Sequence, residues 1–315
     1  MTFEENIEGL GARQTYLWEP AARNYAALRE VETKRVRLAE SEITLQFNPQ
    51  RIRSAAAPTT QASLWERPCF LCPENQPQGQ EAIVWKGTYK VQVNPYPIFP
   101  RHLTISTLEH TPQTIKGRVD DMLSLAYELP NFVVFYNGPH CGASAPDHAH
   151  FQAGNNGVLP IFDELAMATT LLLDDSDEGL LGFVDTLDRN LFTIETTSAQ
   201  CAATYFNRLM RLLPKKRGHA EPMLNVLCRF DKATGIYCMA VFPRRKHRPD
   251  CYGNEPDQFL LSPASVEMGG LWAVPRKEDF KRLNANIIAG IYDELCITRD
   301  QADKVMKRYA EQFQP

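Results

Sequence analysis

Long hydrophobic runs are missing from this sequence. No stretch approaches the roughly 20 apolar residues of a membrane-spanning helix, and the first residues, Met1 to Asn6, are acidic and lack the apolar core of a signal peptide. An excess of positive charge is also missing, because the net charge is -4. We therefore expect a cytoplasmic protein that spans no membrane and binds no nucleic acid. Any anion site must be a local cluster of positive charge.

Cysteines are too scattered to suggest a disulfide framework. The chain has 8 cysteines in 315 residues, and most of them are isolated, which favours reduced thiols. Cys69 and Cys72 form the only Cys-x-x-Cys motif. This spacing allows two thiolates to bind one metal ion, while a redox pair and two buried thiols are the alternatives. A second motif of this kind is absent, so further metal ligands would have to be histidine or carboxylate.

What the sequence does contain is ample material for a folded core. Hydrophobic residues make up 43% of the chain and charged residues 23%, which is typical of a globular protein. The length allows one large domain or two related halves.

A histidine pair that follows a predicted loop is the strongest functional signal. Residues 132–135 are apolar and predict a buried strand, and glycines then indicate a loop that leads to a second strand. Because side chains alternate along a strand, His148, His150 and Gln152 are expected on one face.

The chemistry of this face suits nucleophilic attack on a phosphate. A neutral imidazole can attack phosphorus and later leave. The turn at Gly142 and Ala143 can aim backbone N–H groups at phosphate oxygens, and Ser144 and Asn137 can add side-chain donors. The alternative is that the histidines satisfy local hydrogen bonds, because His-x-His is a common tripeptide.

The complete segment resembles the histidine triad superfamily, in the branch where glutamine replaces the last histidine of the triad. The resemblance rests on Asn137-Gly138, Gly142-Ala143-Ser144 and His148-Ala149-His150-Phe151-Gln152, in that order. The branch contains galactose-1-phosphate uridylyltransferase, diadenosine tetraphosphate phosphorylase and GDP-galactose phosphorylase, and the order of motifs is most similar to the diadenosine tetraphosphate enzymes. The resemblance implies that His150 is a nucleophile that takes up a nucleoside monophosphate, while Gln152 and Ser144 stabilise the phosphate.

The resemblance therefore implies a nucleotidyl transferase or phosphorylase with a covalent nucleotidyl-histidine intermediate. The donor would be a dinucleoside polyphosphate or a nucleotide sugar, the acceptor would be phosphate or a sugar phosphate, and no organic cofactor is implied. A hydrolase of the same superfamily is an alternative, although glutamine in place of the third histidine argues against it. A nucleotide-binding sensor without turnover is another. Dimers are common in the family, so a homodimer is compatible with the resemblance.

A metal site is also implied. Some galactose-1-phosphate uridylyltransferases bind one zinc ion through a Cys-x-x-Cys motif, a histidine before a helix and the first histidine of the pair. Carried over to this chain, the ligands are Cys69, Cys72, His110 and His148. Four protein ligands leave no position for water, so the zinc ion would be structural and would orient the strand that carries His150. Other members of the family lack the cysteines.

Two further segments are candidates for substrate binding. Asn94, in Asn94-Pro95-Tyr96-Pro97, resembles the family's segment that lines the nucleoside pocket. The densest positive cluster, which contains Arg244, Arg245 and Lys246, follows a predicted strand and can clamp phosphates. A solvated basic face is the alternative for this cluster. Arg51 and Arg53 can also reach a phosphate, although a solvated pair in a loop is the simpler interpretation.

Hydrophobic periodicity predicts most of the other elements. Helices are expected over residues 16–40, from Pro112 to about Ala126, over 199–213, and after a capping box formed by Thr298 and Gln301. Strands are expected over residues 89–92, 102–106 and 191–195, with a hairpin formed by 224–229 and 236–242. The acidic segment 171–182 is expected to be a solvated loop.

Together these features predict an α+β fold with two degenerate histidine-triad-like halves around antiparallel sheets with flanking helices. A pattern of two strands, a helix and two strands over about residues 81–154 is expected to recur more loosely over 190–294. We expect an N-terminal helical and loop extension at residues 1–65, a catalytic half with the zinc site at 66–160, and a second half with the C-terminal helices at 161–315.

Overall fold

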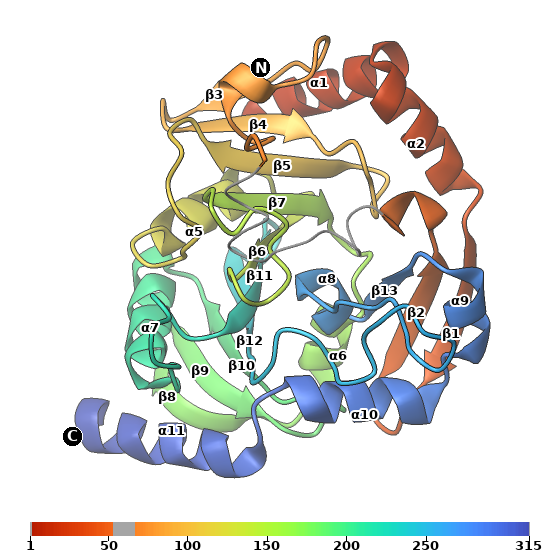
Figure 1. The fold of residues 1–315 in the computed structure, drawn as a ribbon. Helices are drawn as coiled ribbons and strands as arrows, with labels where there is room; N and C mark the ends of the chain where they lie inside the picture. Colours follow the sequence, from red (N-terminus) through yellow and green to blue (C-terminus); the bar gives the residue numbers. More distant parts are fainter. Residues whose placement is uncertain (1, 53–66, 315) are drawn as a thin grey trace.

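The computed structural model describes residues 2–52 and 67–314. One antiparallel sheet of 10 strands runs through the molecule in the order β3-β4-β5-β7-β6-β11-β12-β10-β9-β8 (Figure 1). The first half of the sheet contains β3 (Ile83–Trp85), β4 (Tyr89–Val93), β5 (His102–Thr107), β6 (Phe132–Asn137) and β7 (His150–Asn155). The second half contains β8 (Leu171–Ser176), β9 (Gly179–Val184), β10 (Leu191–Thr196), β11 (Leu224–Asp231) and β12 (Ile236–Pro243). Arg53 and the loop expected at residues 54–63 lie outside the described residues.

The two halves of the sheet have the same topology. Counted from its outer edge, each half places its first three strands in chain order, then its fifth strand and then its fourth. Helix α5 (Val119–Glu128) joins the third and fourth strands of the first half, and α7 (Ala199–Leu212) has the same place in the second. The two fourth strands, β6 and β11, pair at the centre. The predicted α+β fold with two related halves is confirmed.

A small second sheet joins the N-terminal segment to the second half. It consists of β1 (Glu32–Arg37), β2 (Glu42–Phe47) and β13 (Leu271–Val274). β1 pairs with β2 in antiparallel fashion, and β13 pairs with β2 in parallel fashion. Residues near position 45 are therefore held against residues near position 270.

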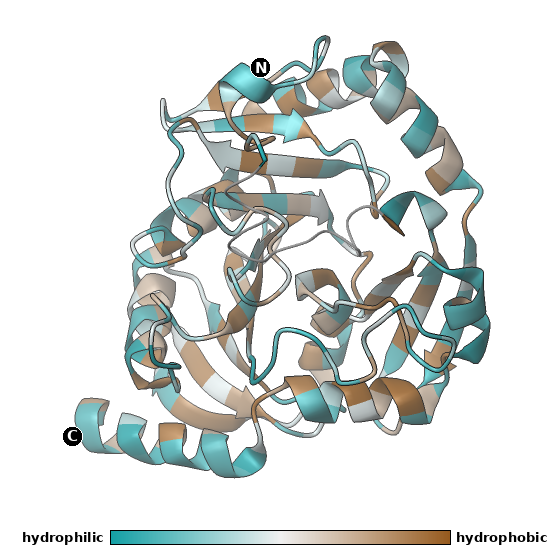
Figure 2. Cartoon of the chain, viewed as in Figure 1, coloured by the Kyte–Doolittle hydropathy of each residue, from teal (hydrophilic) through white to brown (hydrophobic). Residues whose placement is uncertain are grey.

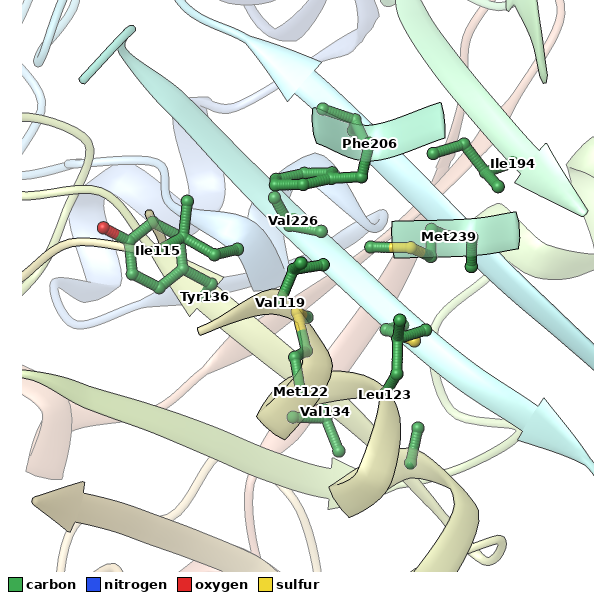
Figure 3. Close-up of a cluster of buried hydrophobic side chains, with 14 of the residues drawn as sticks. Ile115, Val119, Met122, Leu123, Val134, Tyr136, Ile194, Phe206, Val226 and Met239 are labelled. Atoms are coloured by element: carbon green, nitrogen blue, oxygen red, sulfur yellow. The ribbon is translucent and has the colours of Figure 1, made fainter. Parts of the chain in front are cut away.

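One face of the large sheet is covered by α5 and α7. Val119, Met122 and Leu123 of α5 pack against Val134 of β6 and Val226 of β11 (Figure 3). These side chains belong to a large buried cluster, to which the C-terminal helix α11 (Arg299–Phe313) contributes only a few residues. Most of α11 is hydrophilic (Figure 2). Within the described ranges, no helix has the length and apolar character needed to cross a membrane.

The opposite face of the sheet differs between the halves. In the second half a separate buried cluster covers this face, with apolar side chains from α6 (Ile161–Met167), α8 (Ser265–Met268), α9 (Lys277–Arg282) and α10 (Ala285–Leu295). In the first half, strands β4, β5 and β7 instead place polar side chains on this face. Because strand residues alternate between faces, the polar residues of this surface are Lys90, Gln92, His102, Thr104, Ser106, His150 and Gln152.

The prediction of one helix over residues 16–40 is wrong. Helix α1 (Phe3–Leu17) ends first, a second helix α2 (Glu19–Arg29) begins with Pro20 in its first turn, and Glu32–Arg37 is a strand. Proline lacks the N–H that a continuous helix needs but is well suited to the first turn of a new one.

The helix expected from Pro112 begins later, at Val119. The Glu221 carboxylate accepts hydrogen bonds from the hydroxyl of Thr114 (2.7 Å) and the backbone N–H of Ile115 (2.9 Å). These contacts with a residue from the second half hold the segment outside the helix. The helical spacing of apolar residues therefore starts at Ile115, before the helix itself begins at Val119.

The acidic segment 171–182 is not a loop, because it forms much of the hairpin β8–β9. Its acidic residues lie on and next to an edge strand, where charge discourages pairing with another chain. The strands of the second half therefore occupy residues 171–243 rather than 190–294. The hairpin β11–β12, strand β10, helix α7 and the capping box of α11 are confirmed.

Substitution of Gly154 tests the packing beneath β7. A Cβ atom at this position would lie 2.4 Å from the Cδ2 atom of Phe99, a fully buried ring. We expect Gly154→Ala to lower the free energy of unfolding by about 1–3 kcal/mol because the core has no room for the methyl group. Urea denaturation measures this as a lower midpoint with an unchanged m-value.

The matched control is Gly290→Ala in α10, where nothing lies within 4 Å of the added Cβ atom. This variant should be as stable as the natural protein, or more stable by up to about 1 kcal/mol, because alanine favours the helix. Equal stability of the Gly154 variant and the natural protein would show that the packing described here is wrong.

Candidate active site

A cleft of about 620 Å³ opens on the polar face of the first half. This volume is within the range of small-molecule sites. Its walls come from the α1–α2 junction, strands β4 to β7, the loop after β6 and the segment 247–273. The structure brings together there seven of the predicted residues, namely Asn94, Asn137, Gly142, Ala143, Ser144, His150 and Gln152.

The imidazole of His150 is held in one tautomer. Its Nδ1 atom lies 2.8 Å from the backbone carbonyl of His148. A carbonyl can only accept, so Nδ1 carries the proton and Nε2 keeps its lone pair. Burial lowers the pKa of His150 to about 4, so the ring is neutral at pH 7. An oriented neutral imidazole that lines a cleft has the properties of a nucleophile.

The backbone of His150 is fixed as well. The side-chain amide of Gln113 accepts from the N–H of His150 (2.8 Å) and donates to its carbonyl (3.0 Å). The same amide donates to the carbonyl of Asn137 at the end of β6 (2.9 Å). Gln113 therefore ties the start of β7 to the end of β6.

The amide of Gln152 is oriented by its neighbours. His102 accepts at Nδ1 from the backbone N–H of Ile98 (3.1 Å), so its other nitrogen donates to Oε1 of Gln152 (3.0 Å). Asn94 Nδ2 lies 3.4 Å from the same oxygen. Because the oxygen is occupied, the amide nitrogen of Gln152 is left to donate into the cleft.

Asn137 is oriented by the same principle. Its Oδ1 atom accepts from Asn225 Nδ2 (2.9 Å) and from the backbone N–H of Ser265 (2.9 Å). Its amide nitrogen is therefore left for a ligand, as in Gln152. Both of the residues that hold Asn137 come from the second half of the chain.

The loop after β6 adds backbone donors. Gly142 has a φ of 92°, and a Cβ atom there would lie 2.5 Å from the Cβ atom of Ala264, so only glycine fits. In the part of the chain that the structure describes, the N–H groups of Gly142, Ala143 and Ser144 donate to no other group. Successive free N–H groups of this kind form an anion-binding concavity.

Three residues of the predicted basic cluster, Arg244, Arg245 and Lys246, do not line this cleft. Arg245 donates to the backbone carbonyls of Cys296 and Asp293, and Lys246 forms ion pairs with two carboxylates. The guanidinium of Arg244 is buried and donates to Asn225 Oδ1 (2.5 Å). Arg244 therefore positions Asn225, which in turn positions Asn137. Direct phosphate binding by Arg244, Arg245 or Lys246 stays a prediction.

Other cationic side chains reach the cleft. Arg51, Arg67 and Arg248 line it, while Glu267 is the carboxylate among its described lining residues. The cleft is therefore locally positive in a chain with a net charge of -4. The sequence pointed to Arg51 and to the basic cluster that ends with Arg248. Nothing in it distinguished Arg67, which precedes the Cys-x-x-Cys motif.

The side chains of two cysteines and two histidines lie together next to the segment that carries His150. The ligand atoms of Cys69, Cys72, His110 and His148 all lie within 4.8 Å of one another. The Nδ1 atom of His148 lies 3.3 Å from Sγ of Cys69, and that of His110 lies 3.1 Å from Sγ of Cys72. Ligands about 2.0–2.3 Å from a tetrahedral ion are separated by about 3.6 Å, so this set could hold one metal ion.

His148 is prepared for coordination. Its Nε2 atom lies 2.8 Å from the carbonyl of Thr107, so this nitrogen carries the proton and Nδ1 is free to bind a metal. The expectation that His148 shares a strand face with His150 is wrong. His148 precedes β7, and its N–H bonds to the carbonyl of Ala145 in a turn, so its ring points to the cysteines.

Comparisons with known proteins agree with this architecture. A family model described as a domain of unknown function (DUF4922) matches residues 10–155. No curated protein matches the sequence significantly. The crystal structure of yeast Ap4A phosphorylase Apa2 in complex with AMP is similar, with a TM-score of 0.62, 18% identity, and coverage of 92% of this chain and 96% of that one. The complex of the same yeast enzyme with Ap4A gives a TM-score of 0.60, 18% identity, and coverage of 94% and 98%.

These matches cover nearly the whole of both chains at low sequence identity. At this identity the matches show that the chain shares the fold of yeast Ap4A phosphorylase, as the resemblance implied.

Proposed function

We propose that this protein is a nucleotidyl transferase or phosphorylase that works through a covalent nucleotidyl-histidine intermediate. The observation that carries the proposal is the free Nε2 atom of His150 in a cleft lined by hydrogen-bond donors. The shared fold with yeast Ap4A phosphorylase, whose structures contain AMP and Ap4A, supports it. The donor substrate is a dinucleoside polyphosphate or a nucleotide sugar.

In the first step Nε2 of His150 attacks the α-phosphorus of the donor. A P–N bond forms, and the P–O bond to the leaving group breaks with its electron pair passing to the leaving oxygen. The positive charge that develops on the imidazole is stabilised by the hydrogen bond from Nδ1 to the carbonyl of His148. Negative charge on the phosphate oxygens is stabilised by the amides of Gln152 and Asn137 and by the N–H groups of the Gly142 loop.

In the second step an acceptor attacks the nucleotidyl-histidine and the P–N bond breaks. His150 is thereby returned as a neutral imidazole. The acceptor is inorganic phosphate or a sugar phosphate, whose negative charge suits the arginines of the cleft. The two half-reactions predict ping-pong kinetics. Hydrolysis is the corresponding reaction with water as the acceptor.

We also propose that the metal is zinc and that its role is structural. Two thiolates and two imidazoles are a typical zinc set, and four protein ligands close the coordination sphere. The residues Cys69, Cys72, His110 and His148 would hold the ion. A bound zinc ion would fix the turn before β7 and, through the backbone of His148, the nucleophile.

Trapping the intermediate tests the proposed mechanism. The protein is incubated with a dinucleoside tetraphosphate, or a nucleotide sugar, labelled at the α-phosphate and without an acceptor. We expect acid-labile label on the natural protein and none on His150→Ala, because this substitution removes the proposed nucleophile. Adding phosphate or a sugar phosphate should release the label as a nucleotide product.

The control is His219→Ala, which removes a histidine that does not line the cleft. It should be labelled like the natural protein. Labelling of His150→Ala would exclude this residue as the nucleophile. Release of the label by water as fast as by any acceptor would instead make the protein a hydrolase.

Metal analysis tests the zinc proposal. Purified protein should contain about one zinc ion per chain, and Cys72→Ser should lose most of it because a thiolate ligand is removed. The free energy of unfolding should fall by several kcal/mol, which denaturation experiments measure.

The matched control is Cys251→Ser, which changes a partly exposed cysteine outside the cluster. This variant should keep its zinc. An unchanged zinc content in Cys72→Ser, or a natural protein that binds no zinc when refolded with it, would contradict the assignment.

A further inference from the structure

One buried polar side chain in the cleft has no partner. Gln92 on β4 is 3% exposed, and its Nε2 atom makes no hydrogen bond within the described chain. Its side chain lines the cleft. A buried amide without hydrogen bonds is costly, and a side chain in this state at the wall of a ligand cleft indicates a partner supplied by the ligand.

The position of Gln92 relative to the phosphate site is fixed by the sheet. Gln92 pairs with Thr104 on β5, and Thr104 pairs with Gln152 on β7. The three side chains therefore form one row on the same face of the sheet. Two strand spacings separate Gln92 from Gln152, which is about 10 Å. This separation matches the length of a nucleoside monophosphate from its phosphate to the far edge of its base.

The cleft that Gln92 lines also offers surfaces that suit a flat apolar group. Trp18, Pro20, Pro95 and Tyr96 line the same cleft and come from the α1–α2 junction and the segment after β4. Aromatic and proline side chains provide apolar surfaces against which a planar ring can pack. The junction of the N-terminal helices thus forms part of the cleft wall. Gln92 adds to this wall an amide nitrogen that donates to no described group.

The nearby amide of Asn94 is not available in this way. Its Oδ1 atom accepts from the backbone N–H of Tyr96 (2.9 Å), and its Nδ2 atom donates to the hydroxyl of Thr104 (3.0 Å). Both polar atoms of the Asn94 side chain are therefore occupied by protein groups, including the oxygen of Gln152. Gln92 differs because its amide nitrogen donates a hydrogen bond to no described group.

From these observations we propose that Gln92 is the residue that recognises the nucleobase, by forming a paired donor and acceptor contact with one edge of the ring. A neutral amide offers one donor and one acceptor side by side, and glutamine binds adenine in this bidentate manner in protein–DNA complexes. The proposal rests on the proposed function, because it assumes that the α-phosphate of the ligand lies at Gln152 and His150.

Binding of free nucleotides tests this role separately from catalysis. AMP, GMP, CMP and UMP are titrated against the natural protein, Gln92→Leu and Gln92→Glu, with inorganic tripolyphosphate as a probe for the phosphate site alone. These nucleotides share one ribose and one phosphate, so differences among them report the base. Thermal unfolding of each variant shows whether the fold is retained.

We expect the natural protein to prefer one base by at least tenfold. Gln92→Leu should weaken binding of that nucleotide by about 10- to 100-fold, as expected for the loss of two hydrogen bonds, so that the four affinities converge. Gln92→Glu, which can only accept, should favour GMP, because guanine presents two neighbouring donors. Tripolyphosphate should bind the natural protein and Gln92→Leu equally, while the added negative charge of Gln92→Glu weakens the binding of every anion.

Three results would overturn the proposal. One is that the natural protein binds the four nucleotides equally, and another is that Gln92→Leu keeps the natural order of preference. The third is that Gln92→Leu weakens the binding of the nucleotides and of tripolyphosphate to the same extent. Base preference that depends on Gln92 without any labelled histidine would support this inference and refute the covalent mechanism. Labelled histidine without base preference would support the covalent mechanism and refute the role of Gln92.

Discussion

The hydrogen bond from Nδ1 of His150 to the carbonyl of His148 is the interaction on which the site depends. It fixes the tautomer, so that the lone pair of Nε2 is presented to the cleft. The residue that supplies the carbonyl also supplies a ring to the Cys–His cluster, and that ring is fixed by the carbonyl of Thr107. Residue 148 thus links a candidate metal centre to the candidate nucleophile through its own backbone.

The same logic orients the donors around His150. Gln152 and Asn137 have their oxygens occupied by protein groups, which leaves their nitrogens for an anion. The groups that hold Asn137 belong to the second half, and Arg244 supports them from behind. The second half has no histidine pair of its own. The site of the first half is nevertheless incomplete without the residues of the second half.

Much of this site could be predicted from the sequence, because its central residues lie in short motifs. The Cys-x-x-Cys pair, the histidine pair and the glycine loop are local patterns, and the resemblance connected them. The place of Arg67 in the cleft and the lack of a hydrogen-bond partner for Gln92 Nε2 could not be predicted, since both depend on how distant strands and loops pack. The late start of α5 has the same cause, because Glu221 holds Ile115 from more than 100 residues away. The prediction of one helix over residues 16–40 failed for a local reason. The apolar spacing of three and four continued across Pro20, where one helix ends and another begins, and stopped just before β1.

The central claim concerns one nitrogen atom, and nitrogen NMR of ¹⁵N-histidine-labelled protein measures its state directly. With His150→Asn used to assign the signal, His150 should appear at pH 7 as a neutral ring that carries its proton on Nδ1. Its Nε2 signal should shift when AMP is added, because the phosphate then lies beside it. A ring that is protonated on Nε2, or a signal that AMP leaves unchanged, would contradict the account.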